Sequence, residues 1–151
     1  MDNRSFKRTM WNILENRDFK KGKKFYYKDY GELYLKIDVQ KSDYSDGWYL
    51  NYRIIIRELH PDNDLNSEKY DLFGRFLFMI NEKETALLNV GELDETELEK
   101  LFTVGVINVD QVLEKKGLKG YCNMYPDKVT ASTVGAQEFM LKKGYIDETV
   151  S

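Results

Sequence analysis

The stretch "ELYLKIDVQ", residues 32–40, alternates between two kinds of side chain along its whole length. Leu33, Leu35, Ile37 and Val39 are aliphatic, whereas the residues between them are charged, polar or aromatic. A period of two residues is that of a β-strand, in which successive side chains point to opposite faces of the sheet. The stretch therefore predicts a strand that buries its aliphatic face.

The residues before this strand predict a hairpin with it. Phe25 and Tyr27 alternate in the same way, and "DYG" at 29–31 is a short connection that contains glycine. Short connections of this kind join antiparallel neighbours. We expect Phe25 and Tyr27 to face the core of the protein.

The residues after it predict two further antiparallel strands. "DYSDG" at 43–47 turns the chain into "WYLNYRIIIREL" at 48–59. A fourth strand is expected over 72–80, after the loop "HPDNDLNSEK" at 60–69. In the segment 48–59, the side chains expected to face the core are Trp48, Leu50, Tyr52, Ile54 and Ile56.

Helices are predicted both before and after these strands along the chain. Phe6, Met10, Ile13 and Leu14 recur at helical spacing, which predicts a surface helix over 5–17.

Beyond Asn81 the pattern becomes helical. "LLNV" at 87–90 fits a short strand or the start of a helix. Asp94 and Glu97 have the spacing of a capping box at a helix start. We expect "TVGVIN" at 103–108 to interrupt this helix.

Two more helices are expected after that interruption. Asn108 with Gln111 would begin one of them, and Gly117 would end it. "GYCNMYPD" at 120–127 is expected to be a loop, and a last helix is expected over 133–143. The sequence thus predicts one α+β domain over 1–151: an N-terminal helix, an antiparallel meander of four or five strands, and C-terminal helices packed on one sheet face.

Charge is distributed unevenly along the chain. The formal net charge is -3, but residues 1–31 contribute +5 (nine Lys and Arg against four Asp and Glu) and 32–151 contribute -8 (fourteen against twenty-two). The densest acidic segment, 82–100, has seven carboxylates and two lysines. This balance disfavours nucleic-acid binding by bulk charge alone, while a dipolar molecule can steer partners of either sign.

Several compositional features bound the location and the chemistry. Cys122 is the only cysteine, so neither an internal disulfide nor a thiolate metal site is expected. The N-terminal residues lack the apolar core of a signal peptide, and no window approaches the length of a membrane span. We expect a cytoplasmic protein without a cofactor or a metal.

Catalytic motifs are weak in this chain. His60 is the only histidine, and it precedes Pro61 in a loop, where no catalytic role is expected. Asp62, Asp64 and Asn66 resemble the start of a calcium loop, but the glycine and the final glutamate of that motif are missing. No glycine-rich phosphate loop is present.

The segment "FKKGKKFYYKDYG" at 19–31 contains five lysines and five aromatic residues. One interpretation is a nucleic-acid surface in which lysines contact phosphates and tyrosines stack on bases. The other is a structural strand whose aromatic residues pack inward and whose solvated lysines discourage edge-to-edge pairing. The candidate nucleic-acid residues are Lys20, Lys21, Lys23, Lys24, Tyr26 and Lys28, with Tyr30 as a second stacking candidate.

A second candidate surface is the outer face of the predicted sheet. Arginine and tyrosine are enriched at binding hot spots, and arginine can bind a carboxylate or phosphate with two hydrogen bonds. An ordinary solvent-facing sheet is the alternative. The candidate residues are Tyr34, Lys36, Gln40, Tyr49, Asn51, Arg53, Arg57 and Arg75.

Two segments, "FKKGKKFYY" at 19–27 and "IDVQKSDYSDGWYLNYRI" at 37–54, resemble a bacterial family known as domain of unknown function 4304. The matching residues are Gln40, Lys41, Ser42 and Asn51. Members of that family tend to have glycine before the phenylalanine, where this chain has Asp18. The resemblance implies an α+β domain with no established activity. It transfers no catalytic residue to this chain.

Three functional hypotheses follow from these observations. The first is a non-catalytic binding module that recognises a protein or a small anionic partner through the outer sheet face or the acidic segment 82–100. One version of it is an immunity-type protein, whose acidic patch masks a basic toxin surface. The second is a nucleic-acid binder that uses 19–31, and the third is an enzyme with carboxylate, tyrosine or arginine chemistry.

Overall fold

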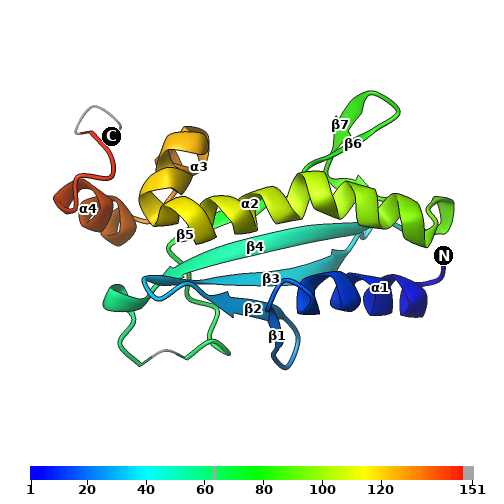
Figure 1. Ribbon diagram of the computed structural model, residues 1–151, viewed down its shortest axis with the longest axis horizontal. Helices are drawn as coiled ribbons and strands as arrows, with labels where there is room; N and C mark the ends of the chain where they lie inside the picture. Colours follow the sequence, from blue (N-terminus) through cyan, green and yellow to red (C-terminus); the bar gives the residue numbers. More distant parts are fainter. Residues whose placement is uncertain (63, 148–151) are drawn as a thin grey trace.

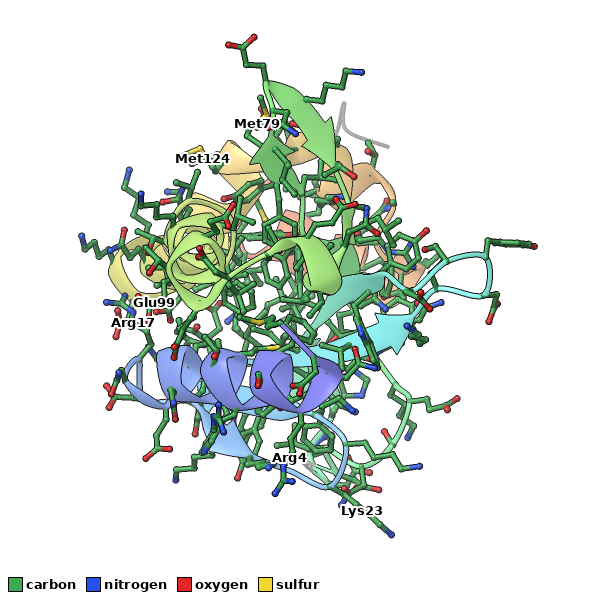
Figure 2. The ribbon with its side chains drawn as sticks, turned by 90° about the vertical axis from the view of Figure 1, so that its right-hand side faces the viewer. Arg4, Arg17, Lys23, Met79, Glu99 and Met124 are labelled. Carbon is green, nitrogen blue, oxygen red and sulfur yellow. The ribbon has the colours of Figure 1, made fainter. Side chains whose placement is uncertain are left out.

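The computed structural model describes residues 1–62 and 64–147. It has an antiparallel sheet with helices α1 and α2 side by side on one face (Figures 1 and 2). The strands are β1 (Lys20–Lys21), β2 (Tyr26–Asp29), β3 (Leu33–Lys41), β4 (Trp48–Ile56), β5 (Leu72–Arg75), β6 (Phe78–Ile80), β7 (Lys83–Thr85) and β8 (Leu87–Leu88). The helices are α1 (Asn3–Glu15), α2 (Glu95–Met124), α3 (Pro126–Thr130) and α4 (Val134–Lys142), with short 3₁₀ turns η1 (Arg57–Leu59) and η2 (Val90–Glu92). The predicted α+β architecture is confirmed.

The sheet follows the order β1-β2-β3-β4-β5, and β8 also pairs with β4. Leu35 pairs with Ile54, and Ile37 pairs with Tyr52, so both central strands turn the same aliphatic face toward α1 and α2. Leu33, Leu35 and Ile37 are fully buried, which confirms the alternation in 32–40. This register places the intervening polar residues together on the outer face.

Helix α1 begins and ends through local signals. The Asp2 side chain accepts a hydrogen bond from the Ser5 amide at 2.8 Å, which satisfies one of the unpaired amides at a helix start. At the other end, Asp18 adopts a left-handed backbone with φ 67°, and the Phe19 amide donates to the Leu14 carbonyl. Glycine adopts this conformation without steric cost. A glycine before the phenylalanine therefore has a physical reason at this position.

The predicted fourth strand, 72–80, is wrong as a single strand. It divides into β5, which pairs with β4, and β6, which leaves the sheet and pairs with β7. The positions of β4 that a longer β5 would need are already paired, because Trp48 faces Leu88 and Tyr49 faces Leu87. The undecided segment 87–90 therefore forms β8 and the start of η2, and β6 and β7 form a projecting hairpin (Figure 1).

The predicted interruption of the helix at 103–108 is also wrong. Helix α2 runs through it, because Phe102, Val106 and Val109 continue the buried stripe. The capping box of Asp94 and Glu97 is confirmed.

The predicted helix start at Asn108 is wrong, because α2 is already helical there, and the predicted helix end at Gly117 is instead a kink within α2. Gly117 has φ 64° and ψ -162° within α2, while the helical turns continue on both sides. The predicted loop 120–127 is wrong, because α2 continues to Met124 and buries Tyr121 and Cys122. The last helix, α4, matches its prediction and is capped by the Thr133 side chain.

Candidate functional site

The orientation of β2 is the reverse of the predicted one. Tyr26 pairs with Ile37 and Lys28 pairs with Leu35, so Tyr26 and Lys28 point toward the helices. Phe25 and Tyr27, which were expected to face the core, lie on the outer face, where Phe25 is nevertheless buried at 8% exposure, and Lys28 is 7% exposed rather than solvated. A shift of one residue in a strand exchanges its two faces. The reason is that Tyr26 stacks on Trp11 of α1, with ring centroids 5.6 Å apart, and fills the inward position.

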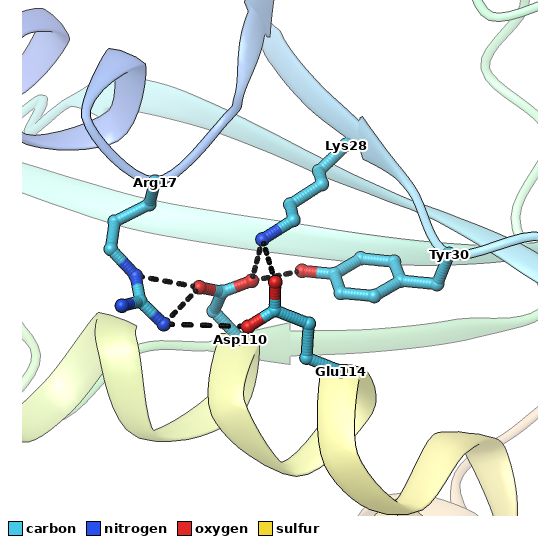
Figure 3. A network of polar contacts seen from close by, with 5 residues as sticks. All are labelled: Arg17, Lys28, Tyr30, Asp110 and Glu114. Carbon is cyan, nitrogen blue, oxygen red and sulfur yellow. Dashed lines mark hydrogen bonds and ion pairs between the residues drawn. The ribbon is translucent and has the colours of Figure 1, made fainter.

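Lys28 belongs to a polar network around the buried Asp110, which connects β2 and α2 with the segment that follows α1 (Figure 3). Its ammonium donates to Asp110 Oδ1 at 2.8 Å and to Glu114 at 3.1 Å. The Tyr30 hydroxyl donates to the same Asp110 oxygen at 2.7 Å, and Arg17 Nε donates to Asp110 Oδ2 at 3.0 Å.

This network has the properties of a structural connection. Asp110 is fully buried, and both of its oxygens accept hydrogen bonds from cationic or hydroxyl donors. Burial, followed by the hydrogen bond to Asp110, raises the pKa of Tyr30 far above its ordinary value, so this hydroxyl remains a donor. Because buried charges must be paired to be tolerated, the network fixes β2 against α2. Lys28 and Tyr30 therefore use their polar groups in hydrogen bonds within the protein, to Asp110 and Glu114.

Three other lysines of this segment, Lys21, Lys23 and Lys24, line a groove between α1 and the turn that joins β1 to β2. We call it the basic groove; its volume is about 640 Å³. Its cationic residues are Lys7, Arg8, Lys21, Lys23 and Lys24. Its aromatic residues are Trp11, Phe25, Tyr26 and Trp48, and Gly22 and Val39 complete the wall.

The charge of the basic groove is not neutralised within the described part of the chain. All five cationic side chains are exposed, no carboxylate lines the groove, and none of the five forms an ion pair with a described residue. Lys7 lies 5.0 Å from the ring centroid of Trp48, and Lys21 lies 6.0 Å from that of Trp11. Such contacts orient a cation but leave its charge in place. In Figure 2, Arg4 and Lys23 extend from the end of the molecule opposite Met79 and Met124.

A second pocket lies on the other side of the same turn, over the outer sheet face. We call it the outer pocket; its volume is about 600 Å³. Its lining residues include four cations and two acids, namely Lys23, Lys24, Lys36, Arg53, Asp38 and Glu68. Phe25 and Asn66 complete the lining.

The two inner cations of the outer pocket are held differently. Lys36 donates to the carbonyls of Leu65 and Ser67 at 2.7 and 3.1 Å, and burial lowers its pKa. The Arg53 side chain forms no hydrogen bond with a described residue, its Nε is buried, and its ion pair with Asp38 spans 3.4 Å. The guanidinium of Arg53 is therefore held less tightly within the described chain than the ammonium of Lys36.

On the rest of the outer sheet face, most polar side chains form hydrogen bonds or ion pairs with one another. Arg75 donates to Asn51 at 2.9 Å and to Gln40 at 3.0 Å, and its guanidinium lies 4.1 Å from the ring centroid of Tyr49. Arg57 pairs with Asp29 at 3.1 Å and lies 5.0 Å from the ring centroid of Tyr34. The structure thus brings the eight predicted face residues onto one side, yet it joins most of them to one another.

The acidic segment has a local structural explanation. Asp94 caps α2, while Glu95 and Glu97 occupy its first turn, where the helix dipole favours negative charge. Glu82 and Glu84 lie instead on the β6–β7 hairpin.

His60 and Cys122 have separate structural partners. His60 Nε2 lies 3.0 Å from both oxygens of Asp71, which also accepts from the Ile56 amide. Cys122 contacts the Met140 sulfur at 3.4 Å, and burial raises the pKa of its thiol to about 11. Within 1–62 and 64–147, no group of three or more His, Cys, Asp or Glu could hold a metal ion, and no helix is long and apolar enough to cross a membrane.

Sequence reasoning found one part of the basic groove and missed another. Lys21, Lys23 and Lys24 were among the predicted residues and line the groove; Lys20 is exposed beside it in β1. Lys7, Arg8, Trp11 and Trp48 were missed, because they come from α1 and β4. The exposed basic face of the predicted N-terminal helix was the one available signal.

Comparisons with known proteins yield a family and no further relative. The model of a family described as a domain of unknown function (DUF4304) matches residues 12–103. That range contains both sides of the β1–β2 turn but neither Lys7 nor Asp110. No curated protein and no solved structure matches the chain.

Proposed function

The chain belongs to the DUF4304 family, whose description assigns no activity, and we propose that it is a non-catalytic module that binds a phosphate-bearing anionic partner in the basic groove. The observation that supports this proposal is the set of five exposed cations around one groove without a carboxylate. Like charges held close together repel one another, and a bound anion removes that cost.

The alternative surface is less well supported. A protein or small anion on the outer sheet face would have to compete with bonds that Arg75, Arg57 and Lys36 already make within the chain. Breaking such bonds subtracts from the affinity that new ones provide. The basic groove has no comparable internal competitor among the described residues.

The two tryptophans of the chain make this proposal directly testable. Trp11 and Trp48 are the only ones in the sequence, and both line the basic groove. Titration with inorganic tripolyphosphate at low salt should therefore give a saturable change in tryptophan fluorescence. A matched pair of double variants separates the groove from bulk charge: Lys7→Glu with Lys21→Glu inside it, and Lys100→Glu with Lys142→Glu on exposed helical positions elsewhere.

We expect the groove variant to lose about tenfold or more in affinity and the control variant to lose much less, since only the first removes phosphate contacts. Both variants change the net charge by the same amount. Equal losses in the two variants, or no saturable change with the unmodified protein, would refute the proposal.

A further inference from the structure

The β1–β2 turn is a shared wall between two pockets. Lys23, Lys24 and Phe25 line both the basic groove and the outer pocket. A ligand that passes over this turn therefore stays in contact with the same two lysines while it moves from one pocket to the other.

Cationic groups continue on both sides of the shared wall. The basic groove adds Lys7, Arg8 and Lys21 from α1 and β1, and the outer pocket adds Arg53 from β4. Lys36 of β3 also lines the outer pocket, but it is 7% exposed and already donates to the Leu65 and Ser67 carbonyls. Asp38 and Glu68 reduce the positive charge of the outer pocket but do not cancel it. Cations distributed over two separate pockets match a chain of phosphates better than a single phosphate group.

The shape of the turn selects a flexible ligand. The Gly22 amide donates to the Phe25 carbonyl at 2.8 Å, and a Cβ on Gly22 would lie 2.4 Å from the Phe25 ring. The ring thus packs directly on the glycine and makes the turn a compact ridge. Duplex DNA is stiff over about 50 nm, so it cannot follow both sides of such a ridge, whereas a single strand can.

Aromatic groups accompany the cations along this path. Trp11 is half-buried at the groove, whereas the Phe25 ring is only 8% exposed, packed on Gly22 with Lys36 4.4 Å from its centroid. Beyond it, the Arg53 guanidinium lies between 5 and 6 Å from the rings of Phe73 and Tyr70, at 5.4 and 6.0 Å. Aromatic rings and planar guanidinium groups stack on bases of any sequence.

We infer that the partner is single-stranded nucleic acid, bound along a path that crosses the β1–β2 turn from the basic groove into the outer pocket. This inference rests on the proposed function and adds the ligand class and the second pocket. Arg53 is the residue that distinguishes it, because this arginine lines the outer pocket but not the basic groove, its side chain is 26% exposed, and its guanidinium is held only by the 3.4 Å ion pair with Asp38.

The experiment compares oligothymidylates of about 3 and about 12 nucleotides, lengths near and beyond the lower site sizes of single-strand binders. Tryptophan fluorescence reports the groove for both lengths. Arg53→Gln should weaken binding of the long strand about three- to tenfold and lower its salt slope by about one, with little effect on the short strand. The matched control is Arg75→Gln, an arginine on the same sheet face outside both pockets.

A second variant keeps the test decisive if Arg53→Gln fails to fold. Glu68 is exposed and lines the outer pocket, so Glu68→Gln should strengthen binding of the long strand without affecting the short one. Two further probes, a duplex and an inorganic polyphosphate of matched charge, should both bind more weakly than the long single strand.

The outcomes separate this inference from the proposed function. Binding of both strands with equal affinity, and no effect of Arg53→Gln or Glu68→Gln, would overturn the inference while the tripolyphosphate result stands. A duplex that binds as well as the single strand would overturn it too. Polyphosphate binding of equal strength would show that bases contribute nothing and would remove the nucleic-acid assignment. Failure of tripolyphosphate and both strands to bind would remove the proposed function itself.

Discussion

Asp110 shows how one residue reorganises the chemistry of a basic segment. Its carboxylate accepts from Lys28, Tyr30 and Arg17, and it thereby withdraws a lysine and a tyrosine from the segment that looked most suited to nucleic acid. The remaining lysines around Gly22 have no such internal partner among the described residues. The structural lysine, Lys28, lies on the inward face of β2, whereas the available lysines lie in β1 and in the β1–β2 turn.

The contribution of Asp110 to the free energy of unfolding can be compared with that of Glu114, the other carboxylate of the network. Asp110→Ala should lower the free energy of unfolding by about 3 kcal/mol or more, because it removes the main counter-ion of a buried lysine. Glu114→Ala should cost less than about 1 kcal/mol, since the Glu114 side chain is 44% exposed. Urea unfolding of both variants gives the comparison. Equal costs would mean that the network does not depend on Asp110.

At the scale of elements, two glycines shape α2: one allows the helix to bend, and the other allows a neighbouring strand to approach it closely. Gly117 has a positive φ inside α2 and lets the helix bend between two buried segments. Gly105 lies against the Leu77 carbonyl, where a Cβ would come within 3.1 Å, so β6 can approach α2 closely. Helical periodicity alone does not reveal either requirement, because both concern a neighbouring element or a backbone angle.

Two glycine substitutions test this interpretation. Gly117→Ala should destabilise the protein by about 1–3 kcal/mol, because L-residues rarely adopt φ 64° with ψ -162°. Gly135→Ala is the control: it lies in α4 with open space around its Cβ position, and it should be neutral or stabilising by up to about 1 kcal/mol. Thermal unfolding distinguishes the two. A neutral Gly117→Ala variant would show that α2 can bend without a glycine.

At the scale of the whole molecule, charge and apolar surface are arranged on different parts. The cations gather around α1 and the β1–β2 turn, whereas exposed Leu77, Met79, Val104 and Met124 lie around the β6–β7 hairpin and α2. A net charge of -3 therefore coexists with a locally positive groove. Local charge rather than net charge governs the approach of an anion at distances below the Debye length, about 10 Å at moderate salt.

The stability of the whole molecule should fall in alkaline solution. Burial raises the pKa of Cys122 from 9.0 to about 11 and that of Tyr52 from 10.0 to about 12, and it also raises the pKa of Tyr121, which shares a hydrogen bond with Tyr52. The folded protein thus binds protons that the unfolded chain releases. The stability is fully present below about pH 9 and is lost as the pH rises toward about 12.

Thermal unfolding between about pH 7 and about pH 12 measures this loss. Tyr52→Phe combined with Tyr121→Phe should reduce the alkaline slope, while Tyr44→Phe should not, because Tyr44 is 98% exposed. An unfolding temperature that stays constant above about pH 9 would contradict the assignment of these groups to the core.

The sequence alone determined the α+β class, the antiparallel order of the central strands and the faces of β3 and β4. Alternation at 32–40 and 48–56 is repeated over many residues, and short connections leave one pairing direction. The same rule failed for β2, where alternating aromatic and basic residues fit either face. Only the contact of Tyr26 with Trp11, 15 residues away, decides between them.

The candidate site was likewise only half determined by the sequence. The lysines around Gly22 are visible as a cluster, but their availability depends on Asp110 taking Lys28, and the groove depends on α1 bringing Lys7 and Arg8 opposite the turn. Tertiary structure made both decisions, because burial and ion pairing join residues that are distant along the chain. Periodicity carries information about one element at a time, whereas a binding surface is a property of several elements together.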